Sequence, residues 1–148
     1  MEMLIARFDR NKPSSHTSVM SEPWANIVEK FRELRSLEND AFRVATSGIE
    51  QIASSVAEGP LKGALFGWTS MHDLCIQQSD VRPYSGPYLR ISPLSSGSVE
   101  FRYIDTAIAH RQWQRVEPAN RAVERLQMFL EQLRWVAPVS NAASSSAA

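Results

Sequence analysis

The side chains of this sequence that could take part in chemistry are one cysteine and two histidines that lie near carboxylates. Cys75 is the most nucleophilic type present, and His72, a potential general base, precedes it by three residues. On a β-strand, residues three apart face opposite sides, so His72 can activate Cys75 only if the segment is helical or bulged. We therefore interpret Cys75 as a buried structural cysteine.

Two histidine–aspartate combinations offer groups for acid–base catalysis. His72 adjoins Asp73, and Asp105 precedes His110 by five residues. Proximity in sequence does not orient an imidazole toward a carboxylate, so neither combination defines a site. An enzyme would need at least two side chains among these four and Cys75 to line one pocket within hydrogen-bonding distance. We assign no catalytic residue and keep a small enzyme as an alternative.

No pattern in the sequence predicts a metal or a nucleotide cofactor. One cysteine and three widely spaced histidines do not supply four ligands at metal-binding spacing. The glycines of Gly59–Gly63 lack the spacing and the Ser or Thr of a phosphate-binding loop. We therefore expect neither a metal nor a cofactor.

The clearest structural signal is a β-hairpin over residues 88–105, because hydrophobic and polar residues alternate on both sides of a Ser-Ser-Gly turn. Pairing Ile91 with Phe101 gathers the apolar side chains on one face. This register leaves Ser95–Gly97 as a three-residue loop that ends in glycine, as a type I turn followed by a left-handed residue requires. It also sets Arg90 directly opposite Arg102 on the outer face.

Like charges across a strand pair are unfavourable unless a negative group lies nearby. Glu100, diagonal to Arg90, is one such group, and a bound anion or an acidic partner surface is the alternative. Arginine outnumbers lysine 13 to 3, and its planar guanidinium suits recognition of carboxylates. Arg90 and Arg102 are therefore candidates for binding a partner.

Three further candidates for partner binding lie outside this hairpin. Arg82 and Tyr84 fall in the turn-rich connection 79–87, and such loops often carry binding residues. Trp113 lies between basic residues in R-Q-W-Q-R, a sequence that could stack bases and hold phosphates. A net charge of zero and the absence of lysine from this region argue against nucleic acid, which stays an alternative as a weak ligand.

Length and composition predict one domain in a reducing compartment. The chain has 148 residues, of which 43% are hydrophobic, enough for one core over residues 21–137. A flexible N-terminal segment, 1–20, and a disordered low-complexity tail, 138–148, are expected to flank it. A single cysteine excludes an internal disulfide, and neither a secretory signal nor a membrane span is recognisable, so we expect a cytoplasmic protein.

Periodicity and capping residues predict the remaining elements. We expect a helix over 21–36 capped by Ser21, a second helix over 41–58 that could instead continue the first, and one strand over 65–77 with a bulge at Gly67. A strand over 113–116 and a helix from Pro118 to Pro138, with Glu117 paired to Arg121, complete the chain.

The predicted fold is thus α+β, with two N-terminal helices, an antiparallel sheet of three to four strands around the 88–105 hairpin, and a C-terminal helix packed on the sheet. The leading functional hypothesis is a non-catalytic, cytoplasmic protein-interaction module of the small bacterial adaptor, chaperone or toxin-neutralising type. Its partner would be another protein with an acidic surface, bound by the outer sheet face and adjoining loops, and a homodimer is compatible with the same hypothesis.

Overall fold

The structure of the chain is a computed structural model that describes residues 21–37, 39–80 and 86–138. Its helices are α2 (Trp24–Leu37), α3 (Asp40–Ala57) and α4 (Ala122–Gln132), with short 3₁₀ helices η2 (Pro60–Gly63), η3 (Ala109–Arg111) and η4 (Ala119–Arg121). Its strands are β2 (Phe66–Ser70), β3 (Asp73–Gln77), β4 (Tyr88–Pro93), β5 (Ser98–Ile104) and β6 (Trp113–Pro118). The predicted flexible segment 1–20 and the predicted disordered tail 138–148, apart from Pro138, lie outside the described residues.

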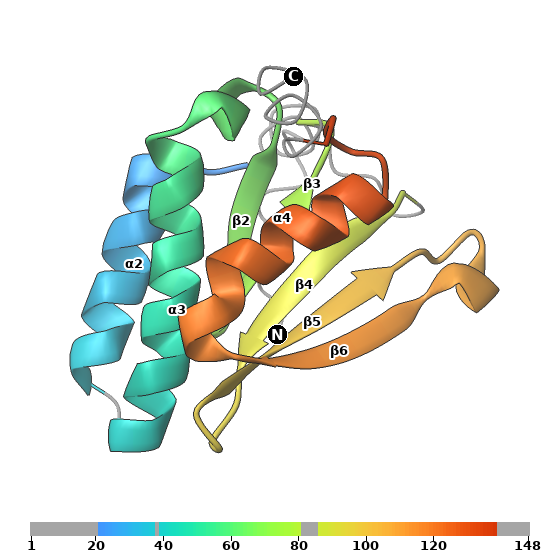
Figure 1. Ribbon diagram of the computed structural model, residues 1–148. Coiled ribbons are helices and arrows are strands. Elements are labelled where there is room, and N and C mark those ends of the chain that lie inside the picture. Colours follow the sequence, from blue (N-terminus) through green and yellow to red (C-terminus); the bar gives the residue numbers. More distant parts are fainter. Residues whose placement is uncertain (1–20, 38, 81–85, 139–148) are drawn as a thin grey trace, which may run out of the picture.

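The described residues confirm the predicted α+β class. The strands form one antiparallel sheet in chain order, β2-β3-β4-β5-β6, and α2, α3 and α4 lie on one side of it (Figure 1). α2 and α3 pack side by side, and α4 crosses the sheet beside α3. The sheet has five strands in this part of the chain, one more than the upper bound that we expected.

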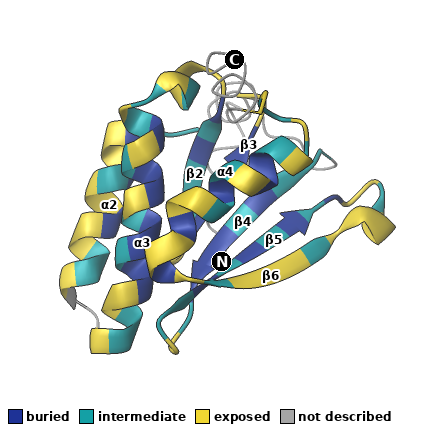
Figure 2. Ribbon diagram, in the orientation of Figure 1, coloured by how far each residue is buried: buried dark blue, intermediate teal, exposed yellow. Residues whose placement is uncertain are grey.

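One hydrophobic core fills the space between the sheet and the helices. Alternate residues of the strands point into it, and β5 shows the pattern clearly, with every second residue buried (Figure 2). The fully buried strand residues that point into this core are Leu74, Ile76, Leu89, Ile91, Val99 and Phe101. Ile27 and Phe31 of α2, Ile49 and Ile52 of α3, and Phe129 and Leu130 of α4 meet them. Residues separated by more than a hundred positions in the sequence, such as Ile27 and Leu130, thus share one buried surface, which the hydrophobic effect stabilises.

The central hairpin has the register that the sequence predicted. Ile91 pairs with Phe101, and Arg90 lies opposite Arg102. The loop closes through a hydrogen bond of 2.9 Å from Leu94 N to Ser98 O, and a second of 2.9 Å joins Gly97 N to Leu94 O. Gly97 has φ +95°, a conformation that glycine adopts without a steric penalty.

The fifth strand arises because residues 65–77 form a hairpin and not the single bulged strand that we predicted. β2 and β3 are joined by the two residues Met71 and His72, and Met71 has φ +58°. Two-residue hairpin loops with positive φ usually contain Gly, Asn or Asp, so the sequence M-H gave no signal for a turn.

Gly67 is not a bulge, because it pairs in regular register with Ile76. A Cβ atom at this position would lie 2.7 Å from Cη2 of Trp24 and 3.1 Å from Cδ1 of Ile27. The indole is held in place by its Nε1, which donates a hydrogen bond of 3.0 Å to Leu65 O. Gly67 therefore allows α2 to approach β2 closely.

The boundary between the first two helices is settled in favour of two helices. Asn39 caps α3, since its Oδ1 accepts a hydrogen bond of 3.0 Å from Phe42 N. Ser21 does not cap α2, contrary to our prediction. The helix begins at Trp24, and the Pro23 carbonyl accepts the first helical bond, from Ile27 N at 3.1 Å. Ser21 instead donates its hydroxyl to Asp80.

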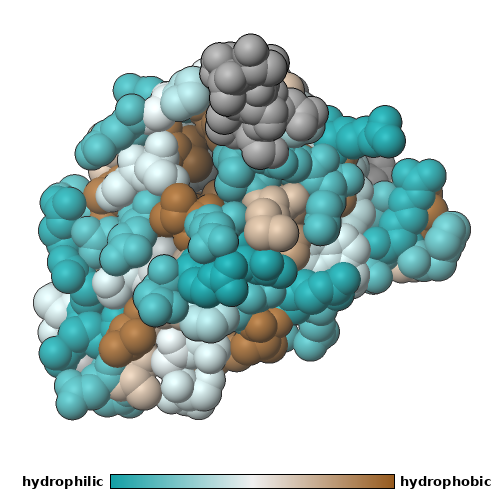
Figure 3. Space-filling view, viewed as in Figure 1, coloured by the Kyte–Doolittle hydropathy of each residue, from teal (hydrophilic) through white to brown (hydrophobic). Residues whose placement is uncertain are grey.

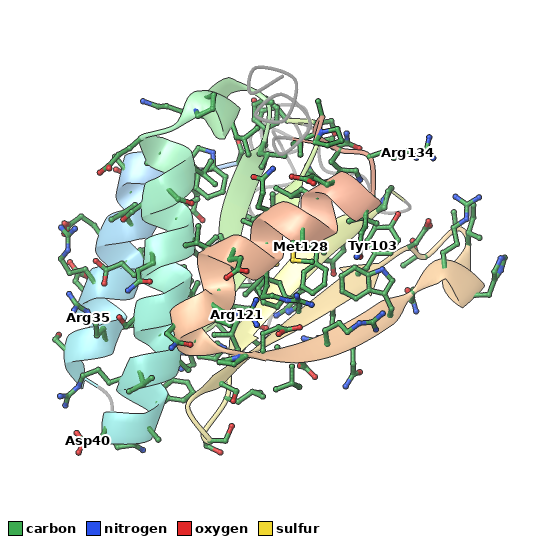
Figure 4. All side chains as sticks on the ribbon, in the orientation of Figure 1. Arg35, Asp40, Tyr103, Arg121, Met128 and Arg134 are labelled. Carbon is green, nitrogen blue, oxygen red and sulfur yellow. The ribbon has the colours of Figure 1, made fainter. Side chains whose placement is uncertain are left out.

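The C-terminal helix is shorter than the predicted 118–138. Pro118 belongs to β6, and α4 ends at Gln132 before a reversal at Arg134, which has φ +63°. Trp135 N donates to Leu130 O at 2.9 Å and Arg134 N to Glu131 O at 3.1 Å, the hydrogen bonds of a Schellman motif. Arg134 projects away from the helix end, and Trp135 folds back toward Tyr103 (Figure 4).

The predicted ion pair between Glu117 and Arg121 is also wrong. Glu117 lies 3.2 Å from Nε of Arg125, whereas Arg121 pairs with Glu124 at 2.8 Å. The reason is that Glu117 ends a strand and Arg121 ends a 3₁₀ turn, so the two do not share one helix.

We expect Gly67→Ala to lower the free energy of unfolding by about 1–3 kcal/mol, because the added methyl group overlaps an indole that cannot move away. Gly63→Ala is the matched control, since a Cβ at Gly63 meets no atom within 4 Å. Urea denaturation of both variants measures the difference. A Gly67→Ala protein as stable as the Gly63→Ala protein would show that Trp24 is free to shift.

Candidate functional site

The sheet face opposite the described helices, here called the outer face, carries the candidate site. One row of directly opposed residues crosses all five strands on this face: Trp68, Cys75, Arg90, Arg102 and Gln114. The helical side of the molecule is largely hydrophilic, with scattered hydrophobic spots (Figure 3). The two arginines that the sequence singled out therefore lie side by side at the centre of the sheet.

Asp73 of β3 supplies the negative charge that the arginine pair requires. Its Oδ2 accepts a hydrogen bond of 2.6 Å from Nε of Arg90 and lies 3.8 Å from NH2 of Arg102. Burial of Arg90 disfavours its charged form and is the largest single effect on its pKa. The hydrogen bond to Asp73, together with the charges of Cys75 and Asp73 and a hydrogen bond to Tyr88, outweighs burial, so the pKa of the guanidinium is raised. Neither a bound anion nor an acidic partner is needed to explain how the two arginines coexist.

Glu100 contributes less than we predicted and acts on the other arginine. It is diagonal to Arg90, but its Oε1 lies 3.5 Å from Nε of Arg102, too poorly aligned for a hydrogen bond. NH2 of Arg102 reaches Oγ of Ser92 at 3.5 Å, which is also long. Arg102 therefore has only long contacts, and its side chain is 38% exposed.

Cys75 lies next to the cluster formed by Arg90, Asp73 and Arg102. It stands between Trp68 and Arg90 in the cross-strand row and is fully buried. Burial raises the pKa of its thiol to about 12, partly offset by Arg90 and reinforced by Asp73. The thiolate, the nucleophilic form, is therefore absent at neutral pH. Burial of Cys75 agrees with its interpretation as a structural residue.

Aromatic side chains flank the arginines on the β2 side of the outer face. The rings of Trp68 and Tyr88 pack with their centroids 5.4 Å apart, and Phe66 precedes Trp68 by two residues on the same face. All three are partly exposed. Val116, on the β6 side, is 54% exposed.

Trp113 does not belong to the outer face, although we grouped it with Arg90 and Arg102. It lies opposite Tyr103 on the helical side of the sheet, with the two rings stacked 5.9 Å apart. Its ring is also 5.0 Å from that of Phe129 in α4, and Tyr103 is visible between α4 and the sheet (Figure 4). Trp113 thus closes the edge of the core, and Arg115 covers it at 5.3 Å.

The other two candidates for partner binding, Arg82 and Tyr84, lie outside the described residues. The segment that contains them connects β3 to β4. Of the five proposed binding residues, the structure therefore places Arg90 and Arg102 together and Trp113 on the opposite side.

The residues that an enzyme would require do not converge in the described part of the chain. His72 is exposed at the β2–β3 turn, where its ring meets that of Phe42 edge-on at 5.6 Å. Asp73 is engaged by arginine, and Asp105 is buried and accepts hydrogen bonds from Ala107 N and Ile108 N at 3.2 and 3.0 Å. None of the five hydrogen-bonds to another, so the pairings of His72 with Asp73 and of Asp105 with His110 are not formed.

Asp73 is the residue of the cluster whose role the sequence analysis missed. We treated it only as a possible partner of His72, because a single strand over 65–77 left its position relative to Arg90 undefined. A hairpin turn at Met71 and His72 places it at the start of β3, whose Cys75 pairs with Arg90.

Among residues 21–37, 39–80 and 86–138, no group of three or more His, Cys, Asp or Glu side chains could hold a metal ion. No helix in these ranges is both long and apolar enough to span a membrane. Comparisons with protein-family models, with curated proteins and with solved structures found no match to this chain.

We expect Asp73→Asn to destabilise the protein by about 1–3 kcal/mol, because it leaves two adjacent guanidinium groups without their shared carboxylate. Glu124→Gln provides the control: it makes the same change from acid to amide in the solvent-exposed pair with Arg121 and should have little effect. Chemical denaturation at low ionic strength compares the two. Equal losses would show that Asp73 acts as an ordinary surface charge.

We expect Cys75 to make stability fall at alkaline pH. Its folded-state pKa of about 12 exceeds the ordinary thiol value of 9.0, so the folded state retains a proton that the unfolded chain releases. The contribution of the protonated thiol to the free energy of unfolding is complete below pH 9. It is lost as pH rises toward 12, at about 1.4 kcal/mol per pH unit. Urea denaturation at several alkaline pH values should therefore give a steeper loss for the wild type than for Cys75→Ala. Parallel profiles would mean that the thiol ionises freely in the folded protein.

Proposed function

We propose that this chain is a non-catalytic, cytoplasmic interaction module that binds another protein through the outer face of its sheet. The observation that carries the proposal is the composition of that face: partly exposed arginine and aromatic side chains on a face opposite all of the described helices. Arg, Trp and Tyr are the types most enriched among residues that dominate binding energy at protein interfaces. Small bacterial adaptors, chaperones and toxin-neutralising proteins are the classes that we propose.

The geometry of the arginines favours a distinct role for each. Arg90 is fixed by its short hydrogen bond to Asp73 and by a contact of 3.2 Å with Oγ of Ser70, so it organises the surface. Arg102 has only the long contacts described above and retains donors for a partner. Because such donors match a carboxylate, an acidic side chain in the partner is the proposed counterpart.

The aromatic residues supply the apolar part of the proposed contact. Trp68 and Tyr88 lie beside the arginines and hold each other in place through ring packing, so little side-chain entropy is lost when a partner binds. An interface with a central arginine and an aromatic border would combine both kinds of contact. Arg82 and Tyr84, in the connection 79–87, lie outside the described residues, and their part in binding stays a prediction from the sequence.

The test is affinity capture followed by titration of the captured partner, after purification, against Arg102→Glu. We expect this variant to lower the affinity at least about tenfold, because it replaces an attraction to the partner's carboxylate by a repulsion. Arg121→Glu makes the same charge change on the helical side at the start of α4 (Figure 4) and should bind as the wild type does. An unchanged affinity for Arg102→Glu, with the fold intact by circular dichroism, would remove this face from consideration.

A further inference from the structure

The two edges of the sheet differ in how their backbone groups are used. At the β2 edge, Glu22 N donates to Gly67 O at 2.8 Å, and the Glu22 carboxylate accepts from Thr69 N at 3.1 Å. Lys30 holds that carboxylate at 2.9 Å. The segment before α2 thus occupies the β2 edge, as natural proteins commonly arrange for edge strands.

No described segment pairs with the free side of β6, the strand at the other edge. The strand is exposed along most of its length, and its ribbon forms the open border of the sheet (Figure 2). A free strand edge is a template for pairing with another strand, unless proline, charge or a covering segment prevents it. The sequence of β6, W-Q-R-V-E-P, ends in its one proline.

The register identifies which backbone groups of β6 face outward. Leu94 and Ser98 form a hydrogen-bonded pair, so Ser98, Glu100 and Arg102 direct their backbone groups toward β4. The alternate residues of β5 then bond to their partners Trp113, Arg115 and Glu117 in β6. Gln114 and Val116 are left with N–H and C=O groups that point away from the sheet.

A second copy of β6, running antiparallel about an axis at Val116, fits this pattern of groups. Val116 would face its own copy and exchange two hydrogen bonds with it, and Gln114 N would donate to Pro118 O of the second copy. Pro118 of the second copy has no N–H to donate to Gln114 O. That carbonyl oxygen is not left unpaired, because it already accepts a hydrogen bond of 3.1 Å from NH1 of Arg115 in its own chain. The donors and acceptors of this edge therefore match themselves.

Charge complementarity selects the same alignment. With Val116 on the axis, Arg115 lies directly opposite Glu117 of the second copy, and the reciprocal pair forms as well. Arg115 has no ion pair with an acidic side chain in the described residues, whereas Glu117 already contacts Arg125 and lies on the same side of the sheet. Moving the axis to residue 115 would oppose Arg115 to its own copy, which is unfavourable.

We propose that the protein forms a homodimer in which two β6 strands pair antiparallel at Val116 and join two sheets into one. The axis of such a pair is perpendicular to the sheet, so the outer faces of both copies lie on the same side. The occupant of the β6 edge is thus a second copy of this chain, and the dimer presents two clusters of Arg90, Asp73 and Arg102 side by side.

Sedimentation equilibrium of the full chain tests the dimer. We expect a mass of twice 16.6 kDa at high concentration, with a dissociation constant of about 1–100 µM, because the contact is small. Val116→Pro removes the outward N–H without breaking a bond to β5 and should give a monomer. Val116→Thr retains the N–H and the β-branched shape and should remain dimeric.

Arg115→Glu tests the register independently of proline. It places two carboxylates opposite each other in each half of the contact and should raise the dissociation constant about tenfold or more. A wild-type protein that is monomeric at about 1 mM would overturn the proposal. It would also be overturned if the wild type dimerises but Val116→Pro and Arg115→Glu, both folded by circular dichroism, dimerise equally well. Partner binding through Arg102 is measured separately, so failure of the dimer leaves the proposed function standing.

Discussion

The fold depends on the sizes of the side chains in one cross-strand row on the inner face of the sheet, the face that the helices cover. Gly67, Ile76, Leu89, Tyr103 and Trp113 lie opposite one another on successive strands, so side-chain volume increases from β2 to β6. Trp24 of α2 occupies the space above the glycine, and Phe129 of α4 packs against the tryptophan at the other end. The helices can share one core because each approaches the sheet where the row leaves room for it.

This inner row determines what the outer face can be. Because successive side chains of a strand alternate between faces, burying Leu89 and Ile91 leaves Arg90 on the outside, and burying Phe101 and Tyr103 does the same for Arg102. Two guanidinium groups at the centre of a sheet require a carboxylate within reach, and β3 provides Asp73. The charged cluster is therefore tied to the register of three strands, and a rigid arrangement of this kind suits a surface that must present fixed side chains to a partner.

Local patterns in the sequence were sufficient to predict those elements whose geometry is determined by their own residues. Alternation and Gly97 defined the register of the β4–β5 hairpin, and Asn39 together with Pro60 bounded α3. Local patterns did not predict features that depend on contacts between residues far apart in the sequence. The sequence around Gly67 suggested a bulge, because the contact of this glycine with Trp24 is not visible in the sequence. Trp113 was assigned to the surface because its packing against Phe129 of α4 could not be predicted. Met71 adopts positive φ in a turn, although methionine is not a typical turn residue. Asp73 could not be assigned to the arginines for the same reason, because its position follows from that unrecognised turn.

The same distant contacts explain the asymmetry of the two sheet edges. Glu22 reaches β2 because α2 is anchored above Gly67 by Trp24, which brings the residues just before the helix alongside the strand. At the opposite edge, the chain leaves β6 through η4 directly into α4, which crosses back over the inner face and covers Trp113 but not the outward backbone of Gln114 and Val116. With α4 folded onto the core in this way, none of the described segments closes the β6 edge. The alternation of Arg115 and Glu117 makes a strand of identical sequence a well-matched candidate for pairing with that edge.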